Sequence, residues 1–144
     1  MRHRSRASNR AELAAVLNDV ATGTCSVLEH LFLTQVVRAH GLPEPERQSP
    51  RVVMEDGGRH EYRDAEWVAH SLVVELDGRL FHDNAGQRDR DLERDLDDVT
   101  GGRVTARLGW GQVSRRACRT ARRLEQLLRT RGWEGAVSRC PECQ

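Results

Sequence analysis

Residues 71–78, which read SLVVELDG, decide the fold. A short apolar run that ends in a turn signal predicts a buried β-strand. Side chains at i and i+2 of a strand leave the same face of a sheet, so we expect Glu75 and Asp77 to project together. The preceding segment 60–67, HEYRDAEW, also predicts a strand. A tight turn at residues 69–70 would fold the two strands into an antiparallel hairpin.

Three carboxylates are expected to meet on one face of this hairpin. The pairing sets Asp64 opposite Glu75, and directly opposed residues have Cβ atoms about 4.5 to 5.5 Å apart. Such carboxylates repel one another unless a cation or protons intervene, and Mg²⁺ selects oxygen ligands of this kind. The pattern therefore predicts a Mg²⁺ or Mn²⁺ site made by Asp64, Glu75 and Asp77. The alternative is that the strand simply ends at the solvent-exposed surface, where Asp-Gly forms a turn and no metal is bound.

The composition predicts one globular domain with a substantial core, because the chain has 144 residues of which 38% are hydrophobic. The basic start is followed by a stretch that Glu12, Asn18 and Asp19 interrupt, so it does not resemble a signal peptide. No run approaches the roughly 18 apolar residues of a membrane span. We expect a cytoplasmic protein without a membrane partner.

The basic residues are all arginines, and their distribution is more informative than the formal net charge of +1. Between residues 115 and 131 arginines dominate the charge, with Glu125 as the only acid, whereas acids dominate the charge of residues 83–98. A basic helix beside an acidic cluster is suited to binding a polyanion, because the arginines can hold the polyanion while a metal bound by the acids contacts its phosphate. The alternative is that these charged residues simply form the solvent-exposed face of a helix and bind no ligand. An aromatic content of 4% argues against a base-stacking platform. The arginines expected to contact DNA are Arg94, Arg115, Arg116 and Arg119.

The predicted order of elements is α-α-β-β-β-α-β-α, an α/β fold with a mixed sheet flanked by helices. The crossover from the third strand through a helix to the fourth implies that these two strands are parallel. The helices are expected at residues 10–21, 26–40, 87–99 and 115–131, and the strands at 51–54, 59–67, 71–77 and 103–110.

This order resembles the core of the PD-(D/E)XK nucleases, which have the restriction-endonuclease-like fold. More specifically, the chain resembles the Vsr-like endonuclease-type domain of unknown function 559, of the actinobacterial type. The resemblance covers about residues 23–143. It is carried by SVLEHLFL at 26–33, GLPEPERQ at 41–48, YRDAEW at 62–67, VVELDGRLFHD at 73–83, RDRDLERD at 88–95 and RVTARLGWGQV at 103–113. It divides the chain into a basic segment and short helix at 1–22, a nuclease-like domain at 23–132 and a tail at 133–144.

The resemblance implies roles for individual residues. Asp64 and Glu75 would be metal ligands, and Asp77 occupies the position where the wider superfamily has a lysine. Glu29 matches the helix carboxylate that completes such sites. Another reading of Glu29 is a capping box with Ser26.

Other residues near this segment have candidate roles. Because the chain has no lysine, His82 is the natural substitute as general base or phosphate contact, since its ordinary pKa is near neutrality. Gln87 and Arg94 are expected to approach the site from the acidic helix. All three residues could instead be purely structural.

The function that the resemblance implies is metal-dependent hydrolysis of DNA phosphodiester bonds, as in repair or defence endonucleases. A first alternative is a nuclease-fold module that has lost cleavage and binds DNA or a partner protein, for example in a toxin–antitoxin system. A second is a structural interaction domain without a metal.

The cysteines suggest a second metal. The sequence CPEC at 140–143 is half of a zinc site, and Cys25 and Cys118 each lie beside a predicted helix start. With Cys140 and Cys143 they could form a structural Cys₄ zinc site that holds the tail. Alternatively, Cys25 and Cys118 are small buried apolar residues, and a cytosolic disulfide is disfavoured.

Overall fold

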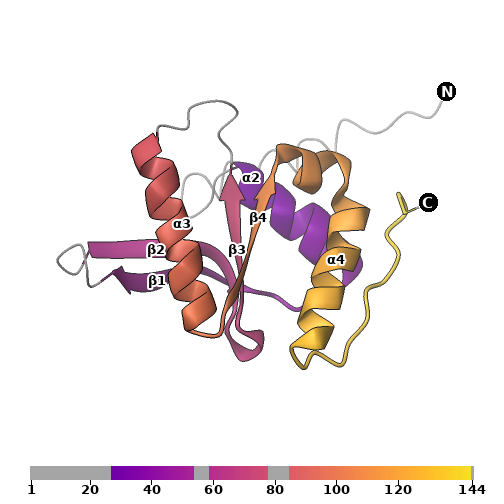
Figure 1. Ribbon diagram of the computed structural model, residues 1–144. Coiled ribbons are helices and arrows are strands. Elements are labelled where there is room, and N and C mark those ends of the chain that lie inside the picture. The colour runs from indigo at the N-terminus through magenta and orange to yellow at the C-terminus, as the bar shows by residue number, and fades with distance from the viewer. Residues whose placement is uncertain (1–26, 54–58, 78–84, 144) are drawn as a thin grey trace.

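The structure of the protein is a computed structural model that describes residues 27–53, 59–77 and 85–143 (Figure 1). The predicted helix at 10–21 lies outside these residues. The elements are α2 (Val27–Leu31), η1 (Phe32–Val37), η2 (Arg38–His40), β1 (Glu46–Val53), β2 (Arg59–Trp67), η3 (Val68–His70), β3 (Leu72–Asp77), α3 (Ala85–Thr100), β4 (Val104–Gly109), η4 (Gly111–Arg115) and α4 (Ala117–Thr130).

The expected α/β architecture is confirmed. A four-stranded sheet has the order β1-β2-β3-β4, and helices flank it (Figure 1). The first two pairings are antiparallel, and β3 and β4 are parallel, as a crossover through α3 requires. The carboxyl ends of β3 and β4 therefore meet at the same edge of the sheet.

The connection between β2 and β3 is longer than the expected tight turn. It consists of the single 3₁₀ turn η3 followed by Ser71, whose φ of 48° is left-handed. The strand register is nevertheless the expected one, since Trp67 pairs with Leu72 and Ala65 with Val74. A left-handed residue is what lets the chain reverse within so few residues.

The first strand differs from the prediction. β1 begins at Glu46, five residues before Arg51, where the sequence predicts the strand to begin. It is an edge strand, which tolerates Pro50 because one side of it needs no ladder hydrogen bonds. The polar residues of GLPEPERQ thus belong partly to the sheet.

The helix expected at 26–40 is present as the continuous segment α2–η1–η2. Its middle turn is wide, of the π type, and Thr34 Oγ1 donates to the carbonyl oxygen of His30 at 2.8 Å. Gly41, with φ of 69°, ends the helix in the left-handed conformation that glycine adopts without steric cost.

The apolar core lies between this helical segment, α4 and one face of the sheet. Phe32 and Val36 come from η1, Val74 from β3, and Leu124 and Leu128 from α4, and all are buried. Their spacing in each helix is the one that places residues on one face. This layer fixes the start of α4 beside η2.

Helix α3 covers the other face of the sheet with a different chemistry. Leu92, Leu96 and Val99 are 60%, 57% and 65% exposed, in agreement with the exposed helix that the sequence predicts. The contacts of α3 with the sheet are polar and are described with the site below. In the part of the chain that the structure describes, no helix is long and apolar enough to cross a membrane.

Candidate functional site

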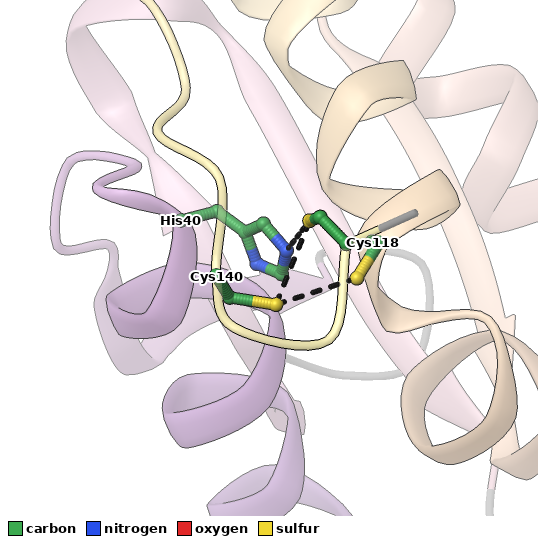
Figure 2. A group of neighbouring side chains, drawn as sticks. His40, Cys118 and Cys140 are labelled. Atoms are coloured by element: carbon green, nitrogen blue, oxygen red, sulfur yellow. Dashed lines mark hydrogen bonds between the residues drawn. The ribbon is translucent and has the colours of Figure 1, made fainter.

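Four metal-ligating side chains converge at the junction of η2, α4 and the tail. They belong to His40, Cys118, Cys140 and Cys143, and their ligand atoms all lie within 4.8 Å of one another. Figure 2 labels His40, Cys118 and Cys140 of this group. This group could bind a metal ion, as the cysteine pattern predicts in part. The fourth donor is His40, whereas Cys25, the fourth ligand predicted from sequence, lies outside the described residues.

The sulfur atoms have the spacing that a shared ion needs. Sγ of Cys140 lies 3.4 Å from Sγ of Cys118 and 3.5 Å from Sγ of Cys143. A tetrahedral Zn²⁺ with bonds of about 2.3 Å would hold two sulfurs about 3.8 Å apart. A disulfide requires about 2.05 Å, so these three cysteines are thiols. A shift of a few tenths of an ångström would bring them to the metal geometry.

The imidazole of His40 is oriented for ligation. It is 1% exposed, and Nδ1 donates to the carbonyl oxygen of Val36 at 3.0 Å. Because Nδ1 carries the proton, Nε2 presents its lone pair, and it lies 3.4 Å from Sγ of Cys143. Metal-binding histidines characteristically have such a backbone partner on the other ring nitrogen.

The thiols interact strongly with one another. The pKa of Cys143 is lowered to about 6, mainly because the Cys118 thiol hydrogen-bonds to it. The pKa of Cys118 is raised to about 12 by the same contact. The group therefore holds a thiolate near neutral pH, which is the form that binds metals.

Backbone contacts hold the tail at this place. Ser138 N donates to the carbonyl oxygen of His40 at 2.8 Å, and Val137 N donates to Oε1 of Glu125 at 3.0 Å. A turn is closed by Cys143 N donating to the carbonyl oxygen of Cys140 at 3.0 Å. The two tail cysteines thus face the helices as a pair.

A cleft of about 900 Å³ opens next to the cysteines. It lies between η1, the start of α4 and tail residues 140–142. The predicted DNA contacts Arg115, Arg116 and Arg119 line it together. The sequence analysis did not select Arg122, which lies one helical turn beyond Arg119 and also lines the cleft.

The predicted carboxylate pair lies elsewhere, near the carboxyl end of β3. The register of β2 and β3 pairs Ala65 with Val74, so one further step places Asp64 opposite Glu75, as expected. Asp64 Oδ2 accepts a hydrogen bond of 2.6 Å from Leu76 N. Asp77 is exposed at the end of the strand, beside Gly109 of β4.

The surroundings of this pair disfavour two negative charges. The pKa of Glu75 is raised to about 7, first by burial and then by the charge of Asp64, while Arg107 and Arg94 act in the opposite direction. Burial also raises the pKa of Asp64, against the Leu76 hydrogen bond. A bound proton or cation would therefore stabilise this pair near neutral pH.

Glu29 lies close to β1, the strand that pairs with β2. It is buried on α2, and its Oε1 accepts a 2.9 Å hydrogen bond from Nε2 of Gln48. In the β1–β2 register Gln48 falls between residues that pair with Ala65 and Arg63, which is the position across from Asp64. Gln48 is left-handed, with φ of 50°. Such strain is found more often at functional sites than elsewhere.

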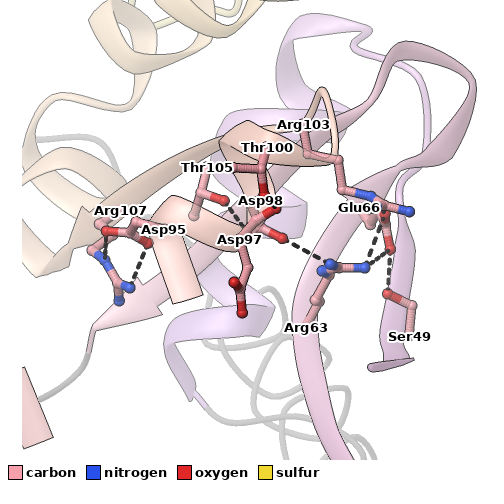
Figure 3. Close-up of polar contacts among 10 residues, drawn as sticks. All are labelled: Ser49, Arg63, Glu66, Asp95, Asp97, Asp98, Thr100, Arg103, Thr105 and Arg107. Atoms are coloured by element: carbon pink, nitrogen blue, oxygen red, sulfur yellow. Dashed lines mark hydrogen bonds and ion pairs between the residues drawn. The ribbon is translucent and has the colours of Figure 1, made fainter. Parts of the chain in front are cut away.

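An ion pair joins α3 to β4 (Figure 3). Arg107 of β4 contacts Asp95 of α3 at 2.8 Å, whereas Arg94 contacts Asp91 at 3.2 Å within α3 itself. Arg94 therefore lies near Glu75, as expected, and not in the cleft with the other predicted arginines. Its role as a DNA contact remains a prediction.

A buried polar network continues this layer toward β1 (Figure 3). Arg63 binds Asp98 at 2.9 Å, and Asp98 accepts from Thr105 Oγ1 at 2.6 Å. Glu66 contacts Arg63 at 3.3 Å and accepts from Ser49 Oγ at 2.7 Å. These hydrogen bonds and ion pairs stand where a helix would usually pack on a sheet through apolar side chains.

The remaining predicted residues stay untested. His82 lies outside the described residues, as does the side chain of Gln87. Within residues 27–53, 59–77 and 85–143, the acidic side chains do not converge into a group of three metal ligands as the cysteines and His40 do. Among these residues the structure thus brings Asp64 and Glu75 together as a pair, and not as the predicted group of three with Asp77.

Comparison of the chain with protein-family models, with curated proteins and with solved structures found no match. The functional conclusion therefore depends on the geometry of the residues themselves.

Proposed function

We propose that the protein is a metal-dependent endonuclease-like hydrolase that acts on DNA phosphodiester bonds. The observation that carries the proposal is the opposed pair Asp64 and Glu75, in which the pKa of Glu75 is about 7. Nothing in the packing of a strand end requires a half-buried pair of like charges, whereas a divalent cation would neutralise it. The restriction-endonuclease-like fold and a cytoplasmic location belong to the same proposal.

Asp64 and Glu75 would hold Mg²⁺ or Mn²⁺, with Asp77 at the rim. When bound, such an ion neutralises phosphate charge and makes its bound water more acidic. Glu29 would complete the acidic set, because Gln48 holds it at the strand across from Asp64. The Arg107 and Arg94 guanidinium groups lower the pKa of Glu75 and so favour its charged form, and Arg94 could also meet a phosphate. His82 remains our proposed general base.

A cleavage assay tests this proposal. Wild type, Glu75→Gln and the control Glu93→Gln, which changes an exposed residue of α3, are incubated with supercoiled and mismatch-bearing DNA. Each reaction contains Mg²⁺, Mn²⁺ or EDTA. We expect nicking by wild type and Glu93→Gln with metal only, and at least a hundredfold loss in Glu75→Gln, since removing one electrostatic stabiliser typically costs this much. Metal-dependent nicking that Glu75→Gln retains would refute the site.

The second candidate function is a module that binds DNA or a partner protein, as in a toxin–antitoxin system, without cleaving. The observation that favours it is the exposed Asp77 at the position where the resemblance expects a lysine. DNA binding without nicking under every metal condition would support it.

For the cysteine and histidine group we propose structural Zn²⁺. Three sulfurs and one imidazole nitrogen form a closed donor set of the type that zinc selects. Metal analysis of the purified protein should find about one zinc per chain, and Cys140→Ser should lose it. Ser138→Ala, a nearby tail change outside the donor set, should keep it. Zinc retained at full stoichiometry in Cys140→Ser would argue against the site.

A further inference from the structure

The cleft beside the cysteine and histidine group has a strongly uneven charge. Four arginines line it against one acid, Glu142, in a protein whose formal net charge is +1. Arg115, Arg116 and Arg119 are exposed, so their charged ends reach the solvent of the cleft. This concentration of guanidinium groups selects an anion.

The arrangement of the arginines suits a row of phosphates. Arg116, Arg119 and Arg122 follow one another at intervals of three residues from the start of α4, so they span about 9 Å along the helix axis. Guanidinium groups bind phosphate through two parallel hydrogen bonds. None of the cleft-lining residues is aromatic, so bases have no stacking partner there. The ligand is therefore recognised through its backbone.

One wall of the cleft is the metal-ligating tail. Cys140, Pro141 and Glu142 line the cleft on one side, and Cys118 lines it on the other. The same Cys118 and Cys140 lie 3.4 Å apart in the donor set. A metal shared by these residues would therefore fix the distance between the tail and the arginines of α4.

The cleft and the carboxylate pair are connected along the chain. Asp77 pairs with Gly109, and only Trp110 and the single turn η4 separate Gly109 from Arg116, which lines the cleft.

We infer that this cleft binds the phosphodiester backbone of a nucleic acid, and that its binding strength depends on the metal that joins the tail to α4. The identity of the ligand rests on the proposed function, but the inference does not require cleavage.

Fluorescence anisotropy with labelled duplex DNA tests the inference on the full chain. The variants are Arg115→Gln with Arg119→Gln, and the control Arg129→Gln, which changes an exposed residue at the far end of α4. Each phosphate contact contributes a factor of about eight at 0.1 M salt, since log K falls by about 0.9 per tenfold rise in salt. We expect the double variant to bind about eight- to sixtyfold more weakly, with a shallower salt dependence. Binding equal to that of Arg129→Gln would overturn the inference.

The role of the metal is tested with Glu142→Arg, which adds a positive charge to the tail wall. We expect tighter binding, by a factor of up to about eight, in the metal-loaded protein and no gain after chelation. Circular dichroism before and after chelation confirms that the sheet and helices remain. An equal gain with and without metal would overturn the metal dependence.

These results separate the inference from the proposed function. Loss of binding in the cleft variants without nicking by wild type would support the cleft and refute the nuclease. Nicking that the cleft variants perform as well as wild type would support the nuclease and refute the cleft. Glu75→Gln should bind DNA at least as tightly as wild type.

Discussion

Replacing Glu75 by glutamine is expected to stabilise the protein above neutral pH in the absence of metal. The pKa of Glu75 rises from 4.5 to about 7 on folding, because burial and Asp64 oppose its charge. One pH unit between two pKa values corresponds to about 1.4 kcal/mol. Ionising Glu75 in the folded protein therefore costs about 3 kcal/mol, and Glu75→Gln removes this cost.

The sign of the pH dependence follows from proton binding. Between about pH 4.5 and 7 the folded protein holds a proton at Glu75 that the unfolded chain has lost, so stability falls as pH rises. Below this window both states are protonated, and above it the full cost is present. Between pH 5.5 and 8.5 the contribution of Glu75 to the free energy of unfolding should fall by about 2 kcal/mol.

Urea denaturation at pH 5.5 and 8.5, in EDTA, measures this difference. Glu75→Gln should lack the loss of about 2 kcal/mol, whereas Glu93→Gln, at an exposed position of α3, should show it like wild type. At pH 8.5, added Mg²⁺ or Mn²⁺ should stabilise wild type and not Glu75→Gln. An unchanged pH dependence in Glu75→Gln would refute the reasoning about the carboxylate pair.

Three further predictions concern the packing that supports the sites, each measured by urea denaturation. Asp98→Asn should lower the free energy of unfolding by about 3 kcal/mol, because it removes the 2.9 Å charge partner of the buried Arg63 and leaves that guanidinium to its longer contact with Glu66, while the exposed control Asp89→Asn should change it by less than about 0.5 kcal/mol. Leu124→Ala should cost about 2 to 5 kcal/mol through the cavity it leaves in the core. Gly41→Ala should cost about 1 to 2 kcal/mol, since φ of 69° is strained with a Cβ atom. Losses near zero would contradict the burial or the conformation assigned to each residue.

Much of the sheet could be predicted because its signals are local. The apolar run in residues 71–78 and the neighbouring segment 60–67 are enough to set the β2–β3 register, and hence to place Asp64 opposite Glu75. The start of β1 could not be predicted, since Glu46 and Pro50 are poor strand residues that only an edge position tolerates. The π turn of η1 also could not be predicted, because no sequence pattern indicates it.

The donor set illustrates a different limit. The pair CPEC predicts two ligands by spacing alone, and Cys118 could be added by residue type. His40 carries no such signal, because it is a single histidine at the end of an apolar helix, where a structural role is the ordinary expectation. Only the packing of η1 against α4 and the hydrogen bond from the tail to His40 bring it to the thiols. Gln48 was missed for a similar reason, since its contact with Glu29 depends on a left-handed backbone.

The separation of the metal ligands along the chain has a consequence for folding. His40 and Cys143 are 103 residues apart. Closing a loop of this length in an unfolded chain costs about 4 kcal/mol of entropy, whereas the sheet and helices have already closed it in the native state. An unfolded chain would offer a metal only the local pair of cysteines. Metal capture by all four ligands would therefore come after the strands and α4 have assembled, and its rate would report on the last step of folding.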